Sequence, residues 1–180
     1  SWGVTLPATN GSTYLGLVAQ PSTGWQEGVS EQLSSPFISG TTYTFNIDLA
    51  NALQSTSGSG IIPGCAECQI WGGFTSCDDN TGTGVLLWAS GNITPYDVWQ
   101  THTVTFTPTQ NFTWVLIRIH SLGCTDGPYI LVDNISPIRP ANVTASVQVN
   151  NNVSCAAGTN GASTVHAVGL NPPFTYAWNT

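Results

Sequence analysis

Hydrophobic and polar residues alternate along most of residues 15–136, and this two-residue period constrains the fold more than any other feature of the chain. Alternation of this kind is typical of strands that bury one face. The runs that show it lie at residues 15–19, 29–33, 45–50, 68–74, 85–90, 99–107 and 114–121, and a nearly continuous apolar run follows at residues 129–136. Gly, Pro and Ser separate the runs, and no stretch has a convincing helical period. These eight runs predict an all-β fold, an antiparallel jelly-roll β-sandwich.

The run at residues 129–136 is expected to close this domain, because Pro137 and Pro140 follow it and proline cannot donate to a sheet ladder. The 180 residues are enough for one sandwich and part of another domain. We therefore expect a jelly-roll domain over residues 1–138, a linker over 139–144 and part of a second module over 145–180.

Asp133 stands inside this apolar run. A half-buried carboxylate is costly unless hydrogen bonds or a cation satisfy it. Asp133 is therefore predicted to be either an anchor that accepts backbone N–H groups or a metal ligand.

The charge of the chain excludes one class of partner. The formal net charge is −7, and the cations are Arg118 and Arg139, with no lysine. Nucleic acid is excluded as a partner, since phosphate binding depends on clustered Lys and Arg. Charged residues make up 6% of the chain, so its solubility must come from Ser, Thr, Asn, Gln and Gly, which favours a secreted or cell-surface protein. No run approaches the roughly 20 apolar residues of a transmembrane helix, and no signal-peptide pattern opens the chain.

The five cysteines are Cys65, Cys68, Cys77, Cys124 and Cys155. Cys68 and Cys77 flank a short strand and turn, so we expect a disulfide between them, which leaves Cys65 to reach Cys124. The alternative is that Cys65 and Cys68 form half of a zinc site, but Cys77 and Cys124 do not supply a second ligand pair. Cys155 has no partner in its own segment. Disulfides indicate an oxidising, extracellular location.

The sequence contains no recognisable catalytic constellation. His102, His120 and His166 lie far apart, and none has a second ligand at metal-site spacing. No Gly-x-Ser-x-Gly nucleophile elbow stands between a strand and a helix. The adjacent Asp78 and Asp79 are typical of a turn. We therefore expect no enzymatic activity.

A binding surface is predicted on the strand 114–121. Its two-residue period sends Trp114, Arg118 and His120 to the outer face, together with Leu116, while Val115, Ile117 and Ile119 face the core. An indole, a guanidinium and an imidazole suit a sugar, which needs ring stacking and directional hydrogen bonds. Asp48 is outward on another strand and joins the predicted ligand set. The alternative is that Arg118 pairs with Asp48 or a neighbour and Trp114 covers a sheet corner.

Several motifs together resemble a known family. They are Gly11-Ser12-Thr13-Tyr14-Leu15, Trp25-Gln26-Glu27-Gly28-Val29-Ser30, Gly40-Thr41-Thr42-Tyr43-Thr44-Phe45, Ile70-Trp71-Gly72-Gly73, Leu86-Leu87-Trp88, Val104-Thr105-Phe106-Thr107-Pro108 and Ile130-Leu131-Val132-Asp133-Asn134-Ile135. Their order and spacing resemble the galactose-binding-like, carbohydrate-binding-module-like domains of secreted Bacteroidetes proteins, over residues 1–138. The resemblance implies a jelly roll with its first strand before Ser1, a scaffold role for Trp71, and a structural calcium ion held partly by Asp133.

Residues 145–180 resemble a different family. Asn152-Val153-Ser154-Cys155, Gly158-Thr159-Asn160-Gly161 and Asn171-Pro172-Pro173-Phe174-Thr175-Tyr176-Ala177-Trp178 are similar to the first half of a SprB-type repeat, an immunoglobulin-like unit of the giant adhesins of gliding bacteria. The resemblance implies a second cysteine near the end of the repeat as the partner of Cys155.

Taken together, the sequence predicts a non-catalytic, secreted or cell-surface adhesin segment that binds glycans or cell-surface polysaccharide. One alternative is a structural segment of an extracellular fibre or filament, which contacts neighbouring copies or domains of the same protein. Another is an accessory carbohydrate-binding module of a larger secreted hydrolase.

Overall fold

The structure, a computed structural model, describes residue 4 and residues 6–53, 64–76, 83–123, 127–141, 143–155, 158–169 and 176. The chain divides into two compact units, Ser1–Arg139 and Pro140–Thr180. All regular structure among the described residues is β-strand.

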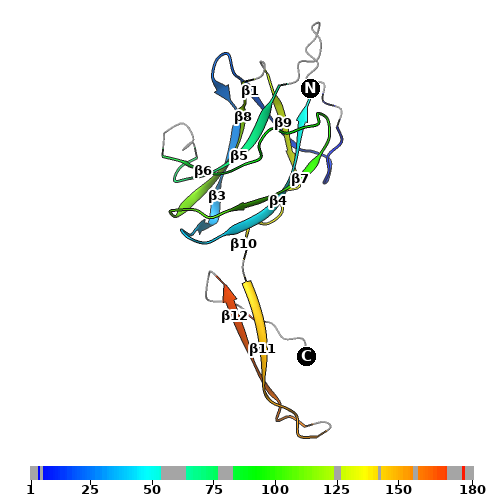
Figure 1. The fold of residues 1–180 in the computed structure, drawn as a ribbon, viewed down its shortest axis with the longest axis vertical. Coiled ribbons are helices and arrows are strands. Elements are labelled where there is room, and N and C mark those ends of the chain that lie inside the picture. The colour runs from blue at the N-terminus through cyan, green and yellow to red at the C-terminus, as the bar shows by residue number, and fades with distance from the viewer. Residues whose placement is uncertain are drawn as a thin grey trace. The chain divides into compact units, whose positions relative to one another are not determined.

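The first unit is built from two antiparallel sheets (Figure 1). The six-stranded sheet contains β1 (Leu15–Gln20), β2 (Trp25–Gln26), β4 (Tyr43–Ala52), β7 (Gln100–Phe106), β9 (Tyr129–Asp133) and β10 (Arg139–Pro140). Its strand order is β10-β4-β9-β1-β2, and β7 also pairs with β4. The four-stranded sheet contains, in spatial order, β3 (Gly28–Phe37), β8 (Phe112–Ser121), β5 (Ala66–Gly73) and β6 (Val85–Ala89). This strand order is that of a jelly roll, which confirms the predicted fold class.

The main hydrophobic core lies between the two sheets. The six-stranded sheet contributes Phe45, Ile47 and Leu49 of β4, and the four-stranded sheet contributes Ile70 of β5 and Ile119 of β8. Val115 and Ile117 pack against the same cluster. The predicted inward face of the strand 114–121 is therefore confirmed, since these side chains alternate into the core at every second position.

A second apolar cluster covers part of the outer face of the six-stranded sheet. It contains Val18, Ala50, Ala52, Tyr129 and Leu131, and Val4, Leu6, Tyr14 and Trp99 pack against it. The Trp99 indole Nε1–H donates to the Pro7 carbonyl at 2.8 Å. The amino-terminal segment thus lies over β4, β9 and β1 and buries both faces of β9 there. Continuous burial explains why residues 129–132 form an unbroken apolar run instead of an alternating one.

The cysteines correct one prediction. Cys68 is a free, fully buried thiol, so the predicted disulfide between Cys68 and Cys77 is wrong. The alternation of β5 sends Cys68 into the core beside Ala66 and Ile70, and burial raises the pKa of its thiol to about 12. Cys77 and Cys124 lie outside the described residues. Cys65 is disulfide-bonded, and its pairing with Cys124 stays a prediction.

The described part of the second unit is a two-stranded antiparallel hairpin of β11 (Val143–Asn151) and β12 (Ala162–Gly169). Val147 and Val149 on β11 are 61% and 59% exposed. Cys155 is an exposed free thiol. A two-stranded hairpin occurs in many folds, so the immunoglobulin-like repeat stays a prediction.

His102 is a partly buried, pH-sensitive group beside the main core. It lies on β7 with its ring 6.1 Å from the Trp88 ring in an edge-on arrangement, and its Nε2 is buried without a hydrogen-bond partner. Burial lowers the pKa of the imidazole, and the Asp48 carboxylate opposes that shift only in part. The unfolded chain therefore takes up a proton at a higher pH than the folded chain does.

We predict that the first unit loses stability as the pH falls below about 6.5, the ordinary pKa of histidine, toward the lowered folded pKa. His102→Phe should remove this dependence and raise the free energy of unfolding at neutral pH by about 1 kcal/mol, because it removes an unpaired buried nitrogen. Urea unfolding at pH values of about 7.5 and 5.5 measures both effects. His166→Gln, an exposed histidine of the second unit, is the control. An equal pH dependence in wild type and His102→Phe would contradict the prediction.

Candidate functional site

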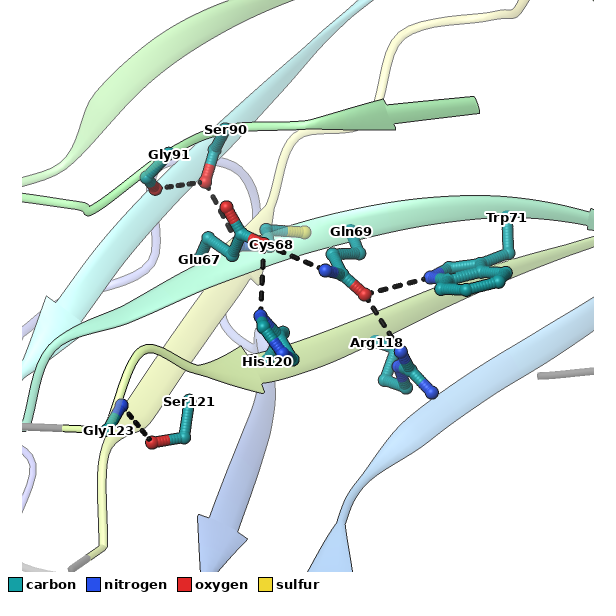
Figure 2. Close-up of polar contacts among 10 residues, drawn as sticks. All are labelled: Glu67, Cys68, Gln69, Trp71, Ser90, Gly91, Arg118, His120, Ser121 and Gly123. Atoms are coloured by element: carbon teal, nitrogen blue, oxygen red, sulfur yellow. Dashed lines mark hydrogen bonds and ion pairs between the residues drawn. The ribbon is translucent and has the colours of Figure 1, made fainter. Parts of the chain in front are cut away.

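The pairing of β5 with β8 brings five polar and aromatic side chains onto the outer face of the four-stranded sheet. The antiparallel register places Glu67 opposite His120, Gln69 opposite Arg118, and Trp71 opposite Leu116. Residues that are directly opposite in a ladder point to the same side of the sheet. Figure 2 shows Glu67, Gln69 and Trp71 on β5 turned toward Arg118 and His120 on β8. We refer to these five residues as the polar network.

Hydrogen bonds join all members of the polar network. Glu67 Oε1 accepts from Gln69 Nε2 at 2.7 Å and contacts His120 Nδ1 at 3.0 Å. Gln69 Oε1 accepts from Trp71 Nε1 at 3.0 Å and from Arg118 Nη2 at 2.9 Å (Figure 2). The Gln69 amide is therefore the central link, and its position on a well-paired strand fixes the other four side chains.

The centre of the polar network is buried, and its outer side chains are partly exposed. Gln69 is 5% exposed, and its oxygen accepts two hydrogen bonds while its nitrogen donates one, as a buried amide requires. The Arg118 guanidinium lies 4.6 Å from the centre of the Trp71 ring, which is within cation–π range. The side chains of His120 and Glu67 are 36% and 14% exposed. The inner part of the network is thus rigid, while its outer atoms reach solvent.

An apolar patch adjoins the polar network along the same ladder. Leu116 follows Arg118 on this face and is nearly buried, and Trp114, opposite Gly73, comes next. On the other side of β8, Gly28 of β3 lies opposite Arg118. A Cβ atom at Gly28 would come within 3.1 Å of Leu116 Cδ1 and 3.4 Å of Arg118 Cβ. Glycine at this position therefore leaves room for both side chains.

Three of the predicted ligand-binding residues share this face, and one does not. Trp114, Arg118 and His120 lie together on β8, as their spacing predicts. Asp48 lies on β4 in the other sheet, where Oδ1 accepts from Thr101 Oγ1 at 2.6 Å and Oδ2 from Asn134 Nδ2 at 3.0 Å. Asp48 is therefore separate from this surface. Arg118 does not pair with Asp48, which lies in the other sheet, but it does donate to a neighbour, Gln69, as the alternative interpretation proposed.

Asp48 and Asp133 are opposite each other across β4 and β9. Burial acts to raise the pKa of Asp48, but hydrogen bonds from Thr101, Thr9 and Asn134 outweigh burial and lower it. Desolvation likewise opposes the shift at Asp133, whose pKa is lowered by the N–H groups of Asn10, Asn134 and Thr9. Both carboxyl groups therefore stabilise the fold above about pH 4, and this contribution is lost as the pH falls through their lowered folded pKa values.

Asp133 holds the amino-terminal segment to the end of β9. Its Oδ2 accepts from Thr9 N at 2.7 Å, Thr9 Oγ1 at 3.0 Å and Asn10 N at 3.0 Å, and its Oδ1 accepts from Asn134 N at 2.7 Å. A calcium ion needs six to eight oxygen ligands, whereas the groups around this carboxylate are mainly N–H donors. Among the described residues, no three or more His, Cys, Asp or Glu side chains come together as a metal site. Of the two alternatives for Asp133, these N–H donors favour the backbone anchor, and the calcium alternative is untested.

Glu67 and Gln69 were not among the site residues predicted from the sequence, and Trp71 was expected to belong to the scaffold. Their spacing in the sequence could have indicated a shared face, because all three lie two residues apart at outward positions of one strand. The sequence does not state which strand pairs with β5 or in which register, and both are needed to place these side chains beside Arg118 and His120.

Comparisons with known proteins return only structures. No protein-family model matches the chain, and no curated protein matches it. One similar solved structure is that of a CBM4 protein, with 21% identity and a TM-score of 0.38, covering 64% of this chain and 60% of that protein's length. A family 16 carbohydrate-binding module has 16% identity and a TM-score of 0.42, covering 77% of this chain and 87% of that one. A CBM28 module described as specific for non-crystalline cellulose has 12% identity and a TM-score of 0.42, covering 73% and 78%.

We predict that Asp133→Ala lowers the free energy of unfolding of the first unit by roughly 1–3 kcal/mol, because several donors lose their acceptor. Thermal unfolding of wild type and variant measures the difference, with the exposed Glu31→Ala as the control for loss of a carboxylate. The wild-type melting temperature should be the same in calcium and in excess chelator. A higher melting temperature in calcium, abolished by Asp133→Ala, would show instead that Asp133 binds the ion.

Proposed function

We propose that the unit Ser1–Arg139 is a non-catalytic carbohydrate-binding module of a secreted or cell-surface protein, and that the outer face of β5 and β8 binds the glycan. The observation that carries this proposal is that the polar network, which includes the Trp71 indole, shares one sheet face with the Trp114 indole. The function therefore depends on this surface and not on any similarity in sequence.

The chemistry of the face matches that of a sugar. A sugar ring has an apolar side that packs on an aromatic ring, and hydroxyl groups that both donate and accept hydrogen bonds. The polar network offers an acceptor at Glu67, a donor at Arg118 and an imidazole at His120. Their mutual hydrogen bonds hold them in place before a ligand arrives, which lowers the entropy lost on binding.

The location and the wider role follow from composition. A face that binds polysaccharide is useful outside the cell, and the sparse charge of the chain suits a secreted or surface protein. No helix among the described residues is long and apolar enough to span a membrane. The module would attach a surface adhesin of the SprB-repeat type to a glycan, or would deliver a larger hydrolase to its substrate.

A second candidate function is that of a structural segment in an extracellular fibre. The observation in its favour is the exposure of Val147 and Val149 on the hairpin of the second unit. Exposed apolar side chains on one strand are typical of a surface that packs against another chain or domain. Absence of glycan binding by the first unit would favour this second candidate.

We predict that Trp71→Ala and Trp114→Ala each weaken glycan binding by about tenfold or more, as expected when a binding surface loses an aromatic anchor. Trp25→Ala is the matched control, because Trp25 lies on β2 and is 52% exposed. A glycan array identifies the ligand, and titration calorimetry with that glycan compares the variants. Trp114→Ala should change the melting temperature little. Equal losses of glycan affinity in all three variants would contradict the proposal. A large loss of stability with unchanged glycan binding in Trp114→Ala would also contradict it.

A further inference from the structure

The charges of the polar network restrict which glycans the face can accept. The network contains one carboxylate, Glu67, and one guanidinium, Arg118. Arg118 is one of two cationic residues in a chain of net charge −7. The other cation, Arg139, lies on β10 at the end of the unit. An acidic sugar on this face would therefore find a single positive group, together with the Glu67 carboxylate and a negative field from the whole chain.

Arg118 also makes contacts within the polar network. Its Nη2 donates to the Gln69 amide oxygen, and its guanidinium lies over the Trp71 ring. These contacts hold the cation against the sheet beside an indole. Arginine frequently binds a carboxylate or phosphate through two parallel N–H groups, and the Nη2 of Arg118 already donates to Gln69. The position of Arg118 favours a role in supporting Trp71 over such a pairing.

The acceptor that the network presents beside Arg118 is the Glu67 carboxylate, whose side chain is 14% exposed. An ionised Glu67 only accepts hydrogen bonds, so the Nδ1 of His120 must donate to Oε1. The second oxygen of Glu67 takes no part in the hydrogen bonds of the network. A carboxylate accepts hydrogen bonds from hydroxyl donors and repels an anionic group.

On the basis of the proposed function, we infer that the face binds neutral glycans and that Glu67 is the residue that excludes acidic ones. A neutral sugar hydroxyl donates to the Glu67 carboxylate, whereas a uronate or sulfate group is repelled by it. Specificity of this kind comes from a repulsive element as well as an attractive one. Glu67 thus has two roles, because it also orients Gln69 and His120.

The test compares neutral and acidic probes on the intact chain. The neutral probes are cellohexaose and mannohexaose, and the acidic probe is hexagalacturonate. Wild type should bind at least one neutral probe and should bind the acidic probe about tenfold more weakly or not at all, since like charges at an interface disfavour association. Glu67→Gln keeps the size of the side chain and removes its charge, so binding of hexagalacturonate should increase about tenfold. Glu31→Gln makes the same change of net charge on an exposed residue of β3 outside the network and should have no effect.

The outcomes separate this inference from the proposed function. Binding of hexagalacturonate by wild type as tightly as the neutral probes would overturn the inference and leave the proposed function in place. An equal increase in hexagalacturonate binding by Glu31→Gln and Glu67→Gln would show that net charge alone causes the effect, and would also overturn the inference. Binding of no probe and of no array glycan would overturn both. If circular dichroism shows that Glu67→Gln does not fold, binding of hexagalacturonate by wild type is measured at two salt concentrations instead. Raising the salt concentration from about 20 to about 300 mM screens the repulsion and should strengthen this binding. Weaker binding at high salt would overturn the inference.

Discussion

The pairing of β5 with β8 is the constraint on which the candidate site depends. Eight consecutive residue pairs, from Ala66 with Ser121 to Gly73 with Trp114, join these strands in one register. In that register Cys68, Ile70 and Ile119 enter the core. A slip of one residue would exchange the two faces of a strand, so apolar burial fixes the register and the register places the outward side chains. The core residues therefore determine the geometry of the polar network indirectly, through the strand register.

The outer faces of the two sheets differ, because one is covered by apolar side chains and the other carries polar groups that reach solvent. On the six-stranded sheet, the amino-terminal segment packs Leu6 and Tyr14 against a second apolar cluster, and Asp133 fastens that segment through Thr9 and Asn10. On the four-stranded sheet, β5 and β8 carry hydrogen-bonded polar groups and indole rings. Covered apolar surface stabilises the domain, while solvent-facing polar groups held by one another are suited to recognition. This division explains why Asp48, although outward on its strand, belongs to the stabilising face.

The sequence predicted those features that depend on local periodicity. Alternation along residues 114–121 correctly assigned Ile117 and Ile119 to the core and Arg118 and His120 to the outer face. Features that depend on pairing between distant strands were not predicted. Gln69 could not be placed beside Arg118 without the register, because the two residues are 49 positions apart. The expected disulfide of Cys68 failed for a related reason, since separation along the chain does not state which face of a strand a side chain occupies.

The central claim is that the outer face of β5 and β8 binds a glycan, and the indole N–H resonances of the seven tryptophans test it most directly. In a ¹⁵N-labelled sample, each indole gives its own signal, and the Trp71 N–H reports on its hydrogen bond to Gln69. Titration with a glycan that binds should shift the Trp71 and Trp114 signals and leave those of Trp88 and Trp99 unchanged. Shifts confined to Trp25 or Trp99, with Trp71 and Trp114 unmoved, would place the binding surface elsewhere and contradict the claim.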